Sequence, residues 1–128
     1  PTNTMDYVTI ATTGNATDFG DLTVARYYAS GLSSDTRGVF AGGHNGTNTL
    51  NTIDYITIQT TGNATDFGDL SIAKHQMAGV SNLSRGCYSG GTNYYVDIEY
   101  ITISTTGNST DFGDLTQGRN TPAGVDGS

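Results

Sequence analysis

One stretch of eleven residues occurs three times in this chain, and this repeat constrains the fold more than any other feature. It reads Thr-Thr-Gly-Asn-(Ala/Ser)-Thr-Asp-Phe-Gly-Asp-Leu at 12–22, 60–70 and 105–115. An acidic residue and then Tyr-(Val/Ile)-Thr-Ile precede each copy, starting at 6, 54 and 99, so the spacings are 48 and 45 residues. Self-similarity at such a period is typical of proteins built from stacked copies of one supersecondary unit.

Each repeated unit predicts four short strands. In the second unit, we expect them at 39–43, 54–58, 67–70 and 77–80. Along the second of these strands Tyr55 and Thr57 alternate with Ile56 and Ile58, so the strand has two distinct faces. Glycine and asparagine follow it and favour a turn, because both tolerate left-handed backbone. We therefore divide the single repeat domain of 128 residues into units at about 1–37, 38–85 and 86–128.

The composition supports an all-β fold and excludes several classes of function. The chain holds 22 threonines and 18 glycines, and no segment carries a helical apolar stripe. The formal net charge is −7, with five basic residues in total. Because nucleic acids are bound through lysine and arginine, we expect no nucleic-acid partner. No apolar run approaches the ~18 residues that span a bilayer, so we expect no membrane insertion.

A four-stranded unit with apolar residues on both faces has to pack against its neighbours on both sides. Blades packed around an axis satisfy this requirement, which predicts a β-propeller. The double glycine, the aliphatic strand, the aromatic residue and the basic residue before a small-residue strand resemble the kelch repeat. Kelch repeats usually carry Trp at the aromatic position, where this chain has Phe19, Phe67 and Phe112. We expect about 2.7 blades and eleven strands, because the first unit lacks its glycine-ended strand.

The amino-acid sequence of the repeat at 11–26 resembles repeats in long structural and tail-fibre-like proteins of bacteriophages. This resemblance implies a non-enzymatic structural or adhesive module, located in a virion or outside the cell. Such a module acts in particle assembly or in binding a host surface. The alternative is a soluble glycan-binding lectin with a shallow site on each blade.

Catalytic motifs are weak, so we predict that the chain is not an enzyme and has no cofactor. Asp18-Phe19-Gly20 matches the metal-binding tripeptide of kinases, but the other kinase motifs are lacking. His44 and His75 occupy unlike positions of the unit and give no metal-ligand spacing. Cys87 takes the position of Val39 and is interpreted as a small buried apolar residue. We interpret the repeated Asp-x-x-Asp pairs as turn residues rather than calcium ligands.

The five basic residues all lie at fixed positions of the repeat. This regularity favours a structural role, in which each pairs with an aspartate or with carbonyl groups of the neighbouring blade. They are Arg26, Arg37, Lys74, Arg85 and Arg119.

Positions at which the units differ are the better candidates for binding. They fall in loops that we expect at the ends of strands, where binding residues are common. Tyrosine, histidine and amide side chains offer stacking faces and polar tips that suit sugars or protein surfaces. The candidate ligand-binding residues are Tyr27, Tyr28, His44, Asn45, His75, Gln76, Tyr94 and Tyr95.

The repeat also predicts burial and assembly. We expect Phe67, Ile56 and Ile58 to be buried between blades. The outer faces of the first and last units are expected to contact copies of the same chain, as a ring that is most simply a trimer, or the rest of a longer chain. The candidate contact faces surround Tyr7 with Ile10 and Ile101 with Phe112.

Overall fold

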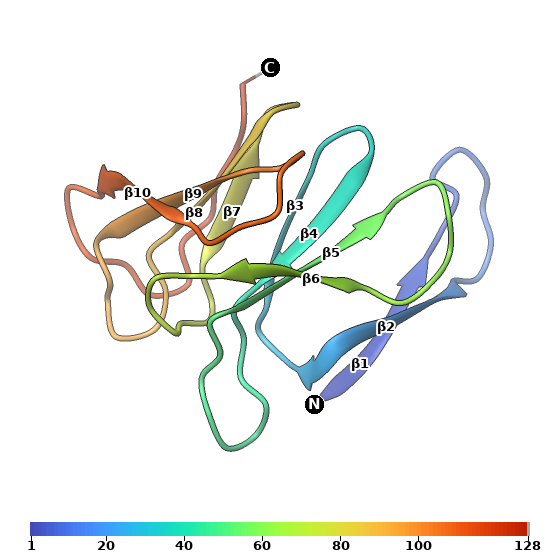
Figure 1. The fold of residues 1–128 in the computed structure, drawn as a ribbon, viewed down its shortest axis with the longest axis horizontal. Helices are drawn as coiled ribbons and strands as arrows, with labels where there is room; N and C mark the ends of the chain where they lie inside the picture. Colours follow the sequence, from blue (N-terminus) through green and yellow to red (C-terminus); the bar gives the residue numbers. More distant parts are fainter. Residues whose placement is uncertain (128) are drawn as a thin grey trace.

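The computed structural model describes residues 1–127, which form β-strands and loops with no helix (Figure 1). The predicted all-β class is confirmed. Among these residues, no helix is long and apolar enough to cross a membrane. The ten strands are β1 Thr2–Tyr7, β2 Thr17–Arg26, β3 Ser30–Ser33, β4 Arg37–Ala41, β5 Thr52–Thr57, β6 Thr65–Asp69, β7 Ala78–Ser81, β8 Arg85–Ser89, β9 Asp97–Thr102 and β10 Thr110–Asp114.

The strands form three antiparallel sheets that follow one another along the chain (Figure 1). Sheet 1 contains β1 and β2, sheet 2 has the order β3-β4-β5-β6, and sheet 3 has the order β7-β8-β9-β10. The repeat is visible in the register, because Val39 lies opposite Tyr55 in sheet 2 as Cys87 lies opposite Tyr100 in sheet 3.

The small-residue strand belongs to a different sheet from the one we predicted. We expected the strand at 77–80 to complete the second unit, but β7 pairs with β8 of the following sheet, with Val80 opposite Cys87. A tight turn explains this pairing, since the Asn82 side-chain oxygen accepts the N–H groups of Ser84 and Arg85 and closes a hairpin. The equivalent segment near Gly124 forms no strand, so the described residues contain ten strands instead of eleven.

The small-residue strands allow sheets 2 and 3 to approach closely. A Cβ atom on Gly79 of β7 would lie 2.7 Å from the carbonyl oxygen of Gly31 in β3, so this approach requires glycine. A single apolar core joins the two sheets. Its members include Val39 and Phe67 from sheet 2 and Ile101 and Ile103 from sheet 3.

The predicted burial is confirmed for Phe67, which is 3% exposed. It is wrong for Ile58, which is 41% exposed, and Ile56 is half-buried. Their counterparts Ile101 and Ile103 are buried, because sheet 2 covers them and Arg37 of β4 donates a hydrogen bond to the Ile103 carbonyl oxygen. Sheet 1 has two strands and no counterpart of β4, so it leaves Ile58 uncovered.

Candidate functional site

Backbone hydrogen bonds bring together three loops that carry predicted site residues. Tyr27 follows β2, and its N–H and C=O groups pair with those of His44 after β4, at 3.1 and 2.9 Å. Tyr28 accepts a bond from the N–H of Gln76, in the loop between β6 and β7. Tyr28 and Gln76 have φ angles of 62° and 61°, a left-handed conformation at equivalent positions of the repeat.

Four rings from these loops form one group, which we call the aromatic cluster: Tyr27, Tyr28, His44 and His75. Tyr27 stacks on His44 with ring centres 5.5 Å apart, and Tyr28 stacks on His75 at 5.8 Å. The two histidines meet edge to face at 5.6 Å, and the two tyrosines do so at 4.9 Å. The tyrosine rings are exposed, whereas the histidines are half-buried.

The surroundings of the aromatic cluster favour a neutral His75. Burial, and then the neighbouring His44, lower the pKa of His75 below its ordinary value, so this ring is uncharged at neutral pH. The Nδ1 atom of His44 accepts the N–H of Gly46 at 3.0 Å. The cluster therefore presents flat rings with polar edges, a surface that suits stacking against a neutral polar ligand.

The other predicted site residues have different roles. Gln76 borders the aromatic cluster, and its side-chain oxygen lies 3.2 Å from the Thr92 hydroxyl. The Asn45 side chain accepts two backbone N–H bonds within its own turn. Tyr94 is 69% exposed, and Tyr95 faces the Lys74 ammonium, which lies 5.9 Å from its ring centre. Neither tyrosine contributes a ring contact to the aromatic cluster within residues 1–127.

Buried ion pairs hold the backbone directly beneath the aromatic cluster. Arg26, which precedes Tyr27, lies 2.6 Å from Asp54 of β5, and both side chains are fully buried. Lys74, which precedes His75, lies 2.8 Å from Glu99 of β9. The predicted pairing of repeated basic residues with a neighbouring acid is confirmed for Arg26 and Lys74.

Cys87 is half-buried and lines a pocket on sheet 3, so the prediction that it is a small buried apolar residue is wrong as regards burial. Burial raises the pKa of its thiol and outweighs the opposite effect of Arg85. A thiol with a raised pKa carries little of the reactive thiolate form. Among residues 1–127 there is also no group of three or more His, Cys, Asp or Glu side chains arranged to hold a metal ion.

Comparison of the chain with protein-family models and with curated proteins finds no match.

The pairing of Lys74 with Glu99 predicts an acid-sensitive fold. Burial alone would raise the pKa of Glu99, but hydrogen bonds from Lys74, Ser109 and Ser71 outweigh it and lower the pKa below its ordinary value of 4.5. In the unfolded chain Glu99 has its ordinary pKa of 4.5, so its stabilising contribution is complete above that pH. The contribution is lost as the pH falls through the lower pKa that Glu99 has in the folded chain. We expect the free energy of unfolding, measured by urea titration, to fall below about pH 4.5.

A Glu99→Gln variant provides the matched comparison. Its stability should depend less on pH across the same acid window, since the titrating carboxyl group is gone. Equal pH slopes for the two proteins would show that Glu99 does not contribute to acid sensitivity.

Proposed function

We propose that the chain is a segment of a kelch-like β-propeller, in which sheets 2 and 3 are two blades and sheet 1 is part of a third. Sheets 2 and 3 have the same strand order. Their first strands, β3 and β7, lie against each other through Gly31 and Gly79, as the inner strands of adjacent blades would. The kelch-like spacing of the double glycines and basic residues also supports this architecture.

The module acts without catalysis, as a structural and adhesive element of a virion or another extracellular particle. One observation carries this proposal: the exposed aromatic cluster is built from positions at which the repeated units differ. Residues that the units share, such as Arg26 and Phe67, are buried in contacts between sheets. The likeness of the repeat to tail-fibre-like phage proteins supports particle assembly and binding to a host surface.

A soluble glycan-binding lectin is the second candidate, and the same cluster favours it. Tyr27 and Tyr28 are exposed rings that stack on His44 and His75, an arrangement that suits stacking against a sugar. The two roles differ in what is recognised. A lectin binds a free mono- or oligosaccharide, whereas an adhesive module binds a polysaccharide or a cell envelope.

We expect Tyr28→Ala to reduce glycan binding at least about tenfold, a loss of about 1.4 kcal/mol of binding free energy. Tyr28 is 55% exposed and stacks on His75, so its removal takes away contact surface with little effect on the core. Binding is measured on a glycan array and then by titration with the best ligand. Tyr94→Ala is the control, because Tyr94 is an exposed tyrosine that makes no ring contact with the aromatic cluster. If both variants bind as the natural sequence does, or no glycan binds, the aromatic cluster is not a glycan site.

A further inference from the structure

The boundary between sheets 1 and 2 is held by a defined set of backbone contacts. The N–H of Gly62 donates to the carbonyl oxygen of Phe19 at 2.7 Å, and the N–H of Ala64 donates to that of Asp21 at 2.8 Å. In return, the Asp21 N–H donates to the Asn63 side-chain oxygen at 3.0 Å. The turn after β5 is thereby fixed to the edge of β2.

The boundary between sheets 2 and 3 has the same backbone contacts at the equivalent residues of the repeat. Gly107 donates to the carbonyl oxygen of Phe67 at 2.7 Å, and Ser109 donates to that of Asp69 at 2.9 Å. The Asp69 N–H donates to the Asn108 side-chain oxygen at 3.0 Å. We predicted that the carboxylates of the Asp-x-x-Asp pairs accept backbone N–H bonds in turns, whereas at these boundaries Asp21 and Asp69 bond through their backbone N–H and C=O groups.

A close glycine contact accompanies the hydrogen bonds at both boundaries. A Cβ atom on Gly20 would lie 2.3 Å from the carbonyl oxygen of Gly62, and one on Gly68 would lie 2.4 Å from that of Gly107. Gly113 of β10 has a similar φ angle of 142°, but no atom lies within 4 Å of a Cβ placed on it.

Both halves of a third boundary are present and exposed. One half is on sheet 3, where Phe112 is 52% exposed, although its counterparts Phe19 and Phe67 are 7% and 3% exposed. The other half is on sheet 1, where residues 14–16 repeat the Gly-Asn-Ala of 62–64 and are exposed. The faces we predicted around Tyr7, Ile10 and Phe112 are therefore open, whereas Ile101 is buried and does not belong to such a face.

The charges of the two halves are complementary. Arg119 follows β10 at the repeat position of Arg26 and Lys74, and it is exposed. Asp6 of β1 occupies the repeat position of Asp54 and Glu99, and it is exposed as well. At both existing boundaries these two positions form a buried ion pair.

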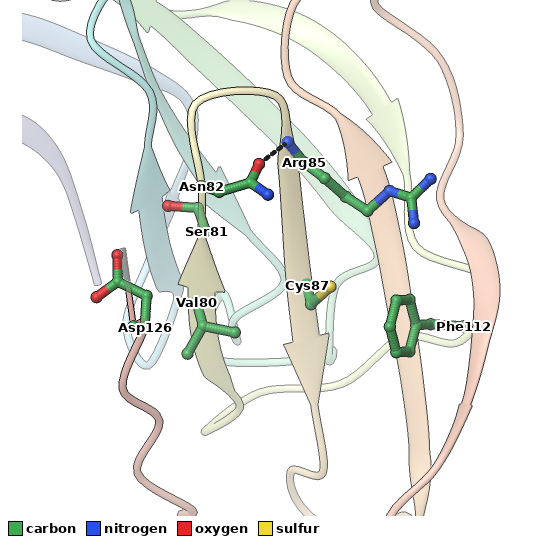
Figure 2. Close-up of a pocket in the computed structure, with 8 residues that line it drawn as sticks. Val80, Ser81, Asn82, Arg85, Cys87, Phe112 and Asp126 are labelled. Carbon is green, nitrogen blue, oxygen red and sulfur yellow. Dashed lines mark hydrogen bonds between the residues drawn. The ribbon is translucent and has the colours of Figure 1, made fainter.

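A pocket of about 360 Å³ marks the apolar part of the open half on sheet 3 (Figure 2). Val80, Cys87 and Phe112 lie in a row across its wall, and Arg85 and Asp126 also line the pocket (Figure 2). On sheet 2 the matching positions are Leu32, Val39 and Phe67, and they belong to or pack on the core that contains Ile101 and Ile103. The matching aliphatic residues of sheet 1, Val8 and Ile10, are 55% and 97% exposed.

Arg85 is already oriented for this contact. Its guanidinium lies 4.3 Å from the ring centre of Tyr100, just as that of Arg37 lies 4.3 Å from Tyr55. Arg37 also donates to the carbonyl oxygen of Ile103 across the sheet boundary at 2.9 Å. The equivalent acceptor for Arg85 is the carbonyl oxygen of an Ile10.

We propose that a second copy of this chain docks its 6–16 segment on the open face of sheet 3, head to tail. Ile10 of one copy fills the pocket beside Phe112 of the other, and Asp6 pairs with Arg119. The contact continues the two boundaries within the chain, with the same residue types at each position. Such a heterologous contact repeats, giving a ring if the rotation closes and a filament if it does not. This interface goes beyond the proposed binding role of the aromatic cluster.

The test is a charge exchange between two exposed side chains. Light scattering of the natural sequence at micromolar concentration should give a mass that is a multiple of 13.4 kDa. Asp6→Arg places two arginines at the contact, and Arg119→Asp places two aspartates there, so each variant alone should fall to the monomer mass. The double variant Asp6→Arg/Arg119→Asp should reassemble, because every contact again joins an arginine to an aspartate.

Asp35→Arg is the matched control, since it makes the same charge change on an exposed residue outside the 6–16 segment and the sheet 3 face. It should keep the mass of the natural sequence, and circular dichroism should show all variants folded. The proposal is overturned if the natural sequence is monomeric. That result is expected if further repeats of a longer chain cover this face. An Asp6→Arg/Arg119→Asp double variant that stays monomeric also overturns the proposal. Neither result affects glycan binding by the aromatic cluster, which the Tyr28→Ala experiment tests separately.

Discussion

Asp54→Ala is expected to lower the free energy of unfolding by about 3–5 kcal/mol, because it leaves the Arg26 charge buried without a partner. Both side chains of this ion pair are fully buried, and their atoms lie 2.6 Å apart. Asp54 also accepts hydrogen bonds from the hydroxyl and the N–H of Thr23, which the substitution removes as well. Urea or thermal unfolding measures the loss.

The double variant Arg26→Met/Asp54→Leu distinguishes two contributions to the free energy of unfolding: the cost of an unpaired buried charge and the net stabilisation by the ion pair. Burial lowers the pKa of Arg26 even though Asp54 opposes that effect, so the charge is held at an energetic cost. Replacing a buried pair by apolar side chains of similar volume is often neutral or stabilising. We therefore expect the double variant to be more stable than Asp54→Ala. A double variant as unstable as the single one would show that packing or the Thr23 bonds, and not the unpaired charge, cause the loss.

Phe67→Ala is the second large effect, with an expected loss of about 3–5 kcal/mol in the free energy of unfolding. Phe67 is 3% exposed and belongs to the core shared by sheets 2 and 3. Its ring also meets Tyr55 edge to face, with centres 5.9 Å apart. The truncation therefore removes buried apolar surface and leaves a cavity at the contact of the two sheets.

The control for this prediction is Leu83→Ala, since Leu83 is 72% exposed in the turn after β7. Exposed substitutions usually change stability by less than about 0.5 kcal/mol. Chemical denaturation of both variants gives the comparison. A loss of less than about 1 kcal/mol for Phe67→Ala would contradict its role in the core.

Features carried by every copy of the repeat were predictable from the sequence. The period, the alternation around Tyr55 and the turn residues indicated short antiparallel strands, and the structure is all-β. The regular spacing of Arg26 and Lys74 indicated a structural pairing, and both are paired with buried acids. Their partners, Asp54 and Glu99, were not singled out, although an acid begins each aliphatic strand in step with the basic residues. That regular spacing could have identified Asp54 and Glu99 as the partners of the basic residues.

The candidate site was predictable only as a collection of residues. Tyr27, Tyr28, His44 and His75 were named because the units differ there, but no spacing in the sequence relates them. Backbone bonds between three separate loops bring their rings together. Tyr94 and Tyr95 were predicted on the same grounds, but within residues 1–127 they make no ring contact with the cluster. Which loops meet is decided by how sheets 1, 2 and 3 follow one another.

The repeating unit, its strands and the chemistry of each repeated position follow from the sequence, because backbone preference and residue alternation act over a few residues. How the strands group into sheets, and which repeated side chains are buried, depends on contacts between distant segments. β7 joins sheet 3 because the turn at Asn82 closes a hairpin with β8. Ile58 and Ile103 have the same identity and position in the repeat, yet they are 41% and 1% exposed. Burial depends on whether a neighbouring sheet provides a covering strand, and no local pattern contains that information.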